Sequence, residues 1–296
     1  MTERLVWNGR LTTLARLRVR GALLIAPALA WLGALLFLPG AALLLIAFTR
    51  RDPDGRIVGE FSARAFERLA GYGVLGWSPD LLITLARTLA AAAGTTLICV
   101  ALAYPVAFAL ARMPPACRRA ALALLTIPLA VNLVVRTQAW ELALAHDAPL
   151  AAAGRALGLL DAGEGWFPST AAVMLGLVSC SLPFAVLPLW TAVQRLDGSL
   201  IDAARDLYGS GWRVFRHAVL PQTRHAAAAA AMLTFFPTMG VFVLNDRLGG
   251  GRFLMIGNLI YQQFTVSRDY PLGAALCLVL VGVTVIALAL TRRRAG

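Results

Sequence analysis

Two carboxylates lie in or at the end of long apolar stretches, where a charged side chain is costly. Glu141 follows Trp140 in one stretch, and Asp246 follows Asn245 at the end of another. Ionisable groups in such stretches are functional candidates by default, because the cost of placing a charge in hydrocarbon must be compensated. A carboxylate supplies charge and an aromatic face supplies a cation–π contact. The two acids, together with Trp140 and Tyr261, therefore predict a site for a cationic solute.

Each of these residues also has a purely structural interpretation. Glu141 can pair with Arg136 on the same stretch, and Asp246 can pair with either of the next two arginines. Trp140 can be an interfacial anchor at a span end, and Asn132, which we expect to be buried, can hydrogen-bond across helices. Both interpretations stay open for the candidate pathway residues, which are Asp246, Asn245, Glu141, Trp140, Asn132 and Tyr261.

The sequence does not favour a metal site or a catalytic nucleophile. The four cysteines and three histidines are scattered, and three of the cysteines lie in apolar stretches, which is typical of core residues. All 27 basic residues are arginine. A Walker A loop requires a lysine, so ATP, if it drives this protein, must be hydrolysed by a separate subunit. We expect no catalytic residue and no cofactor bound by this chain.

The composition indicates an integral membrane protein, with 59% apolar and 14% charged residues. Six apolar stretches are long enough to cross a bilayer, which takes about 20 residues. The first follows an arginine-rich segment, but it is too long for a cleaved signal peptide and is expected to remain as a span. The predicted fold is all-α with six transmembrane helices, at residues 21–48, 81–111, 120–143, 170–193, 226–244 and 271–290.

The distribution of arginine predicts the orientation. The N-terminal segment 1–20, the 112–119 loop, the 194–224 loop and the tail 292–296 hold 16 arginines and four acids. The other three loops hold 9 arginines and ten acids. We therefore expect the first set, and both termini, to be cytoplasmic, with residues 21–291 forming one membrane domain. The net charge of +12 is then a signal of topology and not of nucleic-acid binding.

The 194–224 loop carries two short amphipathic patterns joined by glycines. Asp197-Gly198 is a turn signal, and Ser199 stands three residues before Asp202, which is the spacing of a capping box. A helix starting there would carry an apolar stripe of Leu200, Ala203, Ala204 and Leu207. Two glycines between 209 and 211 should break it, because glycine costs about 1 kcal/mol in a helix interior. A second stripe then runs from Trp212 to Pro221, which we expect to close the second helix.

This loop resembles the cytoplasmic EAA loop of the membrane subunits of ABC importers, which reads E-A-A-x-x-x-G and, nine residues later, I-x-L-P. Asp202-Ala-Ala204 stands at E-A-A, with Asp in place of Glu, and Tyr208 stands at the glycine position, with Gly209 one residue later. The resemblance implies that the 202–216 segment docks in a cleft of an ATPase subunit. The implied coupling residues are Asp202, Ala203, Ala204, Asp206, Tyr208, Gly209, Leu220 and Pro221.

Residues 103–112, 127–136 and 239–264 resemble the polyamine (spermidine/putrescine) branch of these permeases, and the similarity runs from about residue 20 to the end. It implies a MetI-like type I importer fold in the bacterial inner membrane. The implied partners are a second homologous permease subunit, an ABC ATPase dimer that holds ATP and Mg²⁺, and a soluble substrate-binding protein. The implied solute is a small cation, delivered from outside.

Other functions are weighed against this one. The same scaffold can import iron, phosphonate, opines or sulfate, although acids near the pathway favour a cation. A membrane-embedded lipid enzyme would need clustered acids, histidines or serines at one membrane face, and no such cluster is evident. A secondary transporter would be expected to show paired broken helices in an inverted repeat, and it gives no reason for the 194–224 loop.

Overall fold

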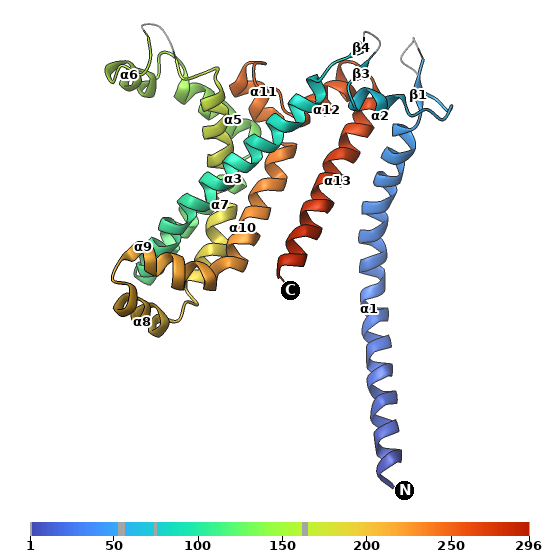
Figure 1. Cartoon of the computed structure of the whole chain (residues 1–296), viewed down its shortest axis with the longest axis vertical. Coiled ribbons are helices and arrows are strands. Elements are labelled where there is room, and N and C mark those ends of the chain that lie inside the picture. The colour runs from blue at the N-terminus through green and yellow to red at the C-terminus, as the bar shows by residue number, and fades with distance from the viewer. Residues whose placement is uncertain (1, 53–56, 74–75, 162–164, 296) are drawn as a thin grey trace.

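The computed structural model describes residues 2–52, 57–73, 76–161 and 165–295, which are mostly helical (Figure 1). The long helices are α1 (Thr2–Ala47), α3 (Asp80–Arg112), α7 (Thr170–Val193), α10 (Leu220–Gly240) and α13 (Tyr270–Ala295). The shorter ones are α2 (Arg64–Leu69), α4 (Pro115–Ala130), α5 (Leu133–Leu144), α6 (Pro149–Ala156), α8 (Gly198–Tyr208), α9 (Gly211–Val214), α11 (Val243–Gly249) and α12 (Ile256–Thr265), with a π-helical turn η1 (Phe215–Val219). Two antiparallel hairpins pair β1 (Arg50–Arg51) with β2 (Ile57–Val58) and β3 (Tyr72–Gly73) with β4 (Gly76–Trp77).

The centre of the molecule is formed by α3, α7 and α10, which pack along one another (Figure 1). Their contact surfaces are made of small side chains, and Ala103, Ala107, Ala185 and Ala230 are fully buried there. Small residues allow the backbones of membrane helices to approach closely, which increases van der Waals contact. A hydrogen bond of 2.9 Å between the hydroxyls of Tyr104 and Thr223 also joins α3 to α10.

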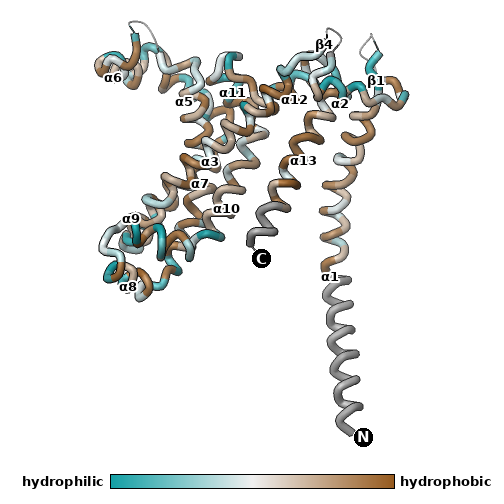
Figure 2. Tube along the Cα trace, viewed as in Figure 1, coloured by the Kyte–Doolittle hydropathy of each residue, from teal (hydrophilic) through white to brown (hydrophobic). Residues whose placement is uncertain are grey.

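The molecule has two polar ends separated by an apolar middle (Figure 2). We call the end that carries α8 and α9 the loop end, and the end that carries the strands, α2, α6, α11 and α12 the hairpin end. The N-terminus of α1 and the C-terminus of α13 both extend toward the loop end (Figure 1). Residues 2–20, expected as a separate segment, continue α1 as helix, and α13 takes in most of the expected tail up to residue 295, with residue 296 outside the described residues.

Two of the expected spans are bent and not straight. The helices α4 and α5 meet at 102°, and the helix that ends at Gly240 meets α11 at 68°. A proline lies in the last turn before each break, Pro128 in α4 and Pro237 in α10. Proline removes an N–H donor and clashes with the carbonyl four residues earlier, which weakens the helix there. Among the described residues, four helices are long and apolar enough to span a membrane, and six spans result if each bent pair counts as one.

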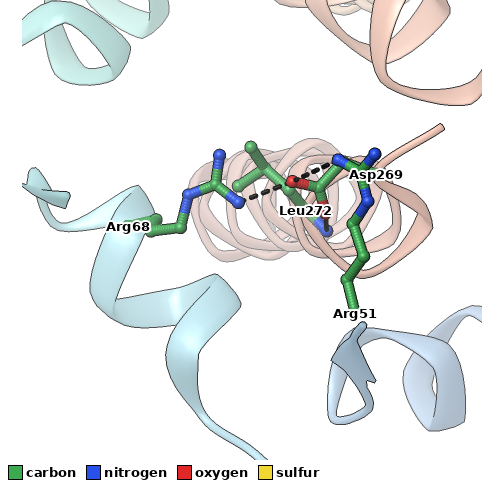
Figure 3. Close-up of polar contacts among 4 residues, drawn as sticks. All are labelled: Arg51, Arg68, Asp269 and Leu272. Carbon is green, nitrogen blue, oxygen red and sulfur yellow. Dashed lines mark hydrogen bonds and ion pairs between the residues drawn. The ribbon is translucent and has the colours of Figure 1, made fainter. Parts of the chain in front are cut away.

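At the hairpin end, one buried carboxylate holds together three elements that are distant in sequence (Figure 3). Asp269 lies 2.5 Å from a guanidinium nitrogen of Arg68 on α2 and 4.0 Å from one of Arg51 on β1. The carboxylate also accepts a hydrogen bond of 3.3 Å from the backbone N–H of Leu272, in the first turn of α13. The segment between α1 and α3 is thereby attached to the start of α13.

Candidate functional site

The α8–α9 loop begins with a side-chain cap. The carboxylate of Asp197 accepts hydrogen bonds from the backbone N–H of Ser199, at 2.9 Å, and from its hydroxyl, at 2.7 Å. The cap is therefore Asp197, and the prediction of a capping box at Ser199 and Asp202 was wrong. The Ser199 hydroxyl and, next, its N–H hold the pKa of Asp197 below its ordinary value. Asp202 instead accepts a hydrogen bond from Arg205, three residues later, at 2.8 Å.

Only one residue of the E-A-A-like triplet on α8 is buried. Ala204 is buried, while Asp202, Ala203 and Asp206 are exposed. Three large apolar side chains of the loop also face outward and are exposed by more than half, namely Leu200 (53%), Leu207 (75%) and Trp212 (70%). Unlike the apolar side chains of the spans, these lie on a polar end of the molecule. We call these three exposed apolar side chains together the docking face.

The expected glycine elbow is present. Gly209 has φ of +65° and ends α8 in the left-handed conformation, in which only glycine is unstrained. The ring of Tyr208, which stands where the EAA consensus has glycine, stacks on that of His217 with centroids 4.7 Å apart. Ser210 then caps α9 by accepting a hydrogen bond from the N–H of Arg213 at 3.3 Å. The one-residue shift of the glycine therefore lengthens α8 and leaves the elbow intact.

The second half of the loop differs from the prediction. Pro221 was expected to close a short helix, but the chain stays helical from Gly211 to Gly240. The π-helical turn η1 precedes the proline, and the N–H of Leu220 bonds to the carbonyl of Phe215, five residues back. This wider turn provides room for a ring that would clash with the carbonyl four residues back in a regular α-helix. Leu220 and Pro221 thus join the loop rigidly to α10.

A hollow of about 840 Å³ separates α8 and α9 from the ends of the central helices. Its wall includes Phe108 and Arg112 of α3, Leu196 after α7, and Ile201 and Arg205 of α8. The loop therefore rests on the bundle chiefly through η1, whose Val219 belongs to the central core and whose Phe215 packs against Tyr104 of α3.

At the hairpin end, Glu141 pairs with a different arginine from the expected one. Its side chain is 12% exposed and lies 3.7 Å from a guanidinium nitrogen of Arg247 on α11. Glu141 and Arg136 are five residues apart and so point about 140° away from each other around α5. The Nε and one Nη atom of Arg136 are buried and have no hydrogen-bond partner among the described residues.

The adjacent residues Asn245 and Asp246 have opposite environments. Asn245 is fully buried, and its side-chain N–H groups bond to the carbonyl of Val241 at 2.7 Å and contact the amide oxygen of Asn258 at 3.4 Å. Asp246 is exposed, and it makes no ion pair among the described residues. Its backbone N–H bonds to the carbonyl of Phe242, one turn earlier. Asn245 thus holds the α11–α12 junction together, and Asp246 offers an accessible charge.

An aromatic pair includes Phe242, one helical turn before Asp246. The rings of Phe242 and Tyr261 stack with centroids 4.7 Å apart and planes 13° from parallel, and Tyr261 is 47% exposed. Sequence reasoning did not single out Phe242. Phe242 stands four residues before Asp246, at the start of a helix. Residues at this spacing lie on the same face of a helix, and this is the signal that could have identified Phe242.

The remaining two candidates stabilise α5. The indole N–H of Trp140 donates to the hydroxyl of Ser179 on α7 at 2.9 Å, so Trp140 is a contact between helices. Asn132 is exposed in this chain and was expected to be buried. Its side-chain oxygen caps α5 by accepting a hydrogen bond from the N–H of Val134 at 2.8 Å. Asn132 thus satisfies a backbone donor that the break after α4 leaves without an intrahelical partner.

Comparison with known proteins identifies relatives that match most of the length of this chain. The chain is 34% identical over 245 residues to the spermidine/putrescine transport system permease protein PotB of Salmonella typhimurium, covering 83% of each chain. It is 30% identical over 256 residues to PotB of Haemophilus influenzae, covering 86% of each, and 31% identical to the inner membrane ABC transporter permease protein YdcU of Escherichia coli, covering 70% of each. No protein-family profile matches the chain.

A solved structure shares the fold. A bacterial ABC transporter involved in the import of the acidic polysaccharide alginate has a chain that superposes with a TM-score of 0.70, at 14% identity, over 96% of this chain and 99% of that one. The same kind of transporter in complex with an alginate pentasaccharide-bound periplasmic protein gives a TM-score of 0.67 at 14% identity. Together with the identity to PotB over most of the length, these findings establish that the chain is a transport permease subunit and not an enzyme, and that it belongs to the ABC transporter permease family that includes the PotB proteins.

Proposed function

We propose that this chain is a membrane subunit of an ATP-driven importer and forms part of the pathway for a polyamine such as spermidine or putrescine. The observation that carries the proposal is the 34% identity to PotB permeases over 83% of the chain. The exposed carboxylate of Asp246, one helical turn from the stacked rings of Phe242 and Tyr261, supports a cationic solute. Ammonium groups are stabilised by a carboxylate charge and by cation–π contact with aromatic faces.

The α8–α9 loop couples the pathway to ATP hydrolysis in this proposal. The docking face, formed by Leu200, Leu207 and Trp212, is an exposed apolar surface of the kind that protein partners cover. We assign it to a cleft in an ABC ATPase dimer, which binds ATP and Mg²⁺, while this chain binds no cofactor. Closure of the dimer then moves the loop and α10 as one body and shifts the permease between inward-open and outward-open states.

The proposed topology follows from the same assignment. With the loop end in the cytoplasm, both termini are cytoplasmic and each bent helix pair forms one of six spans of a single permease domain, residues 21–291, in the bacterial inner membrane. The hairpin end then faces the soluble substrate-binding protein.

The most apolar window of α1 is unburied in this chain, and an apolar groove of about 410 Å³ runs along Ala228, Ala231 and Phe235 of α10. Both surfaces support a second homologous permease subunit.

A second candidate is the import of an anion on the same scaffold. The observation that favours it is the half-buried guanidinium of Arg136, with two nitrogen atoms that lack a partner among the described residues. A phosphonate or sulfate group would satisfy such a donor. The exposed Asp246 opposes this candidate, because it would repel the same anion.

Uptake of labelled spermidine and putrescine by cells that express the whole transport system tests the proposal. Three variants of this chain are compared with wild type: Gly209→Pro, Asp246→Asn and, as a matched control, Asp147→Asn, an exposed acid at the same end. Proline cannot adopt the positive φ of Gly209, so uptake should be lost. Removal of the Asp246 charge should lower uptake several-fold, and Asp147→Asn should leave it unchanged.

The possible outcomes separate the parts of the proposal. Uptake that is lost only in Gly209→Pro keeps the importer and removes Asp246 from the pathway. A complex that assembles and hydrolyses ATP but takes up no polyamine excludes the polyamine as solute. Uptake that persists without the ATPase subunit contradicts the coupling mechanism.

A further inference from the structure

An apolar pocket lies at the hairpin end and shares only Trp140 with the candidate pathway residues. It has a volume of about 490 Å³ and is lined by the end of α5, by α6, by Leu157, Leu159 and Trp166 after α6, and by the start of α7. That volume is within the range of small-ligand sites, about 300–1,000 Å³. Its principal lining residues are two tryptophans and four leucines, namely Trp140, Trp166, Leu150, Leu157, Leu159 and Leu175.

The two tryptophans present only their apolar surfaces to the pocket. The indole N–H of Trp140 donates to Ser179 at 2.9 Å, and that of Trp166 donates to the carbonyl of Leu150 at 3.1 Å. Both polar groups are therefore already satisfied within the protein. The other lining residues are leucine, alanine and glycine, whose side chains cannot hydrogen-bond.

This wall selects against an extended protein segment as the occupant. Such a segment brings backbone N–H and C=O groups, and burying these without partners costs free energy. A hydrocarbon chain has no such groups, and burying it gains about 25 cal/mol for each Å² of apolar surface removed from water. The chemistry of the pocket therefore favours an acyl chain.

The surroundings of the pocket favour a membrane lipid as the source of that chain. Leu150, Leu157 and Leu159 are 50%, 75% and 63% exposed, and Leu142 on α5 is 67% exposed. The pocket also borders the first turns of α7, a helix long and apolar enough to span the membrane. Polar side chains stand just before α6, where His146 and Asp147 form an exposed pair at 2.9 Å. An apolar pocket with polar side chains between two of its lining residues, Leu144 and Leu150, suits an acyl chain and its polar headgroup.

We infer that this pocket binds one acyl chain of a phospholipid, in the outer leaflet if the proposed topology holds, and that α6 lies at the membrane surface. Gly154 of α6 is pressed against Trp166, and an added Cβ would come within 2.8 Å of the indole. The helix thus closes one side of the pocket at a fixed distance from the ring. This lipid site is independent of solute transport, and its test does not measure transport.

Photo-crosslinking tests the inference. The full chain is reconstituted in nanodiscs of phosphatidylethanolamine and phosphatidylglycerol with a trace of phosphatidylcholine that carries a diazirine on one acyl chain. After illumination, adducts are located by mass spectrometry. We expect adducts on peptides that contain Leu150, Leu157 or Trp166, and adducts on α13 serve as an internal reference.

Two filled-pocket variants and one matched control decide the result. Ala153 of α6 and Ala171 of α7 line the pocket, so Ala153→Trp and Ala171→Trp should each lower the pocket adducts several-fold relative to α13. Ala152 is equally exposed on α6 but does not line the pocket, so Ala152→Trp should not change them. Adducts that persist in both filled variants, or that fall equally in Ala152→Trp, overturn the inference. Adducts that disappear when the complete transporter assembles assign the pocket to a protein partner and also overturn it.

Discussion

Glu141 and Asp246 show how position determines what a carboxylate can do in this protein. Both lie at the hairpin end, but Glu141 is 12% exposed and held by Arg247 across the α5–α11 contact, whereas Asp246 is exposed without an ion pair among the described residues. A buried charge that is already paired has little left to offer a ligand. We therefore assign Glu141 to the positioning of α5 against α11, and the solute contact to Asp246.

Gly257 allows α12 to approach the break between α10 and α11. A Cβ at this position would lie 2.9 Å from the carbonyl oxygen of Gly240 and 3.0 Å from that of Val241. Backbone atoms cannot move aside as a flexible side chain can, so Gly257→Ala should lower the free energy of unfolding by about 1–3 kcal/mol, the usual cost of overpacking. Thermal unfolding of the purified chain in detergent measures this change.

Gly282 in α13 provides the control for that measurement. An added Cβ there has no atom within 4 Å, so Gly282→Ala should be neutral or slightly stabilising. Similar melting temperatures for Gly257→Ala and wild type would mean that the α12 contact yields more easily than its geometry implies.

Among the elements, the α8–α9 loop combines a fixed shape with little support from the bundle. Its elbow is set by Gly209, its two helix starts are capped by Asp197 and Ser210, and η1 joins it to α10. The hollow of about 840 Å³ beneath it means that these local bonds, more than burial, maintain its conformation. Loss of one cap should therefore loosen the loop without unfolding the spans.

Asp197→Ala should speed amide hydrogen exchange in the first turn of α8 several-fold. The substitution removes the acceptor for the N–H and hydroxyl of Ser199, and alanine is a poor cap. Asp206→Ala is the control, because Asp206 is exposed on the same helix and is not its cap. Hydrogen exchange followed by mass spectrometry should show no change for the central helices in either variant.

The same cap predicts a specific dependence on pH. The pKa of Asp197 is lowered by its hydrogen bonds with Ser199, so the charged form stabilises the folded loop. That stabilisation is complete above the ordinary carboxyl pKa of 3.8 and is lost as the pH falls through the lowered value. Protection of the first turn, corrected for the intrinsic exchange rate, should therefore be constant between neutral and mildly acidic pH. A loss of protection in that range would show that another group holds the turn.

For the whole molecule, the sequence was sufficient wherever the determinant is local. Apolar length located the long apolar helices, and two glycines within three residues located the elbow. Hydropathy averaged over a window could not locate the breaks after Ala130 and Gly240. At these breaks the side chains of Asn132 and Asn258 satisfy backbone groups, and a window average does not register single side chains. The contacts of Asp269 with Arg51 and Arg68 join residues about two hundred positions apart, so no local pattern could reveal them. For Glu141, Arg136 was one possible partner considered from the sequence, and the observed partner, Arg247, lies on another helix where no local pattern points to it.

The arrangement of the whole chain predicts which residues a membrane-impermeant maleimide can reach. Leu207 at the loop end is 75% exposed, and the side chain of Asp147 at the hairpin end is 84% exposed, so each position is accessible as a cysteine. Cys117, at the start of α4, is exposed and would react in the background, so Cys117→Ser is introduced first. Because the arginine-rich ends are retained in the cytoplasm, Leu207→Cys should react only in inverted membrane vesicles.

Asp147→Cys should show the opposite behaviour and react in intact spheroplasts. The Cys117→Ser chain without further changes is the control, since Cys99 is buried and Cys180 and Cys277 are half-buried. Labelling of both positions from the same side would contradict the separation of the two polar ends across the bilayer. A reversed pattern would keep that separation but place the docking face outside the cell, where no ATPase subunit could bind it, and the coupling mechanism would fail with it.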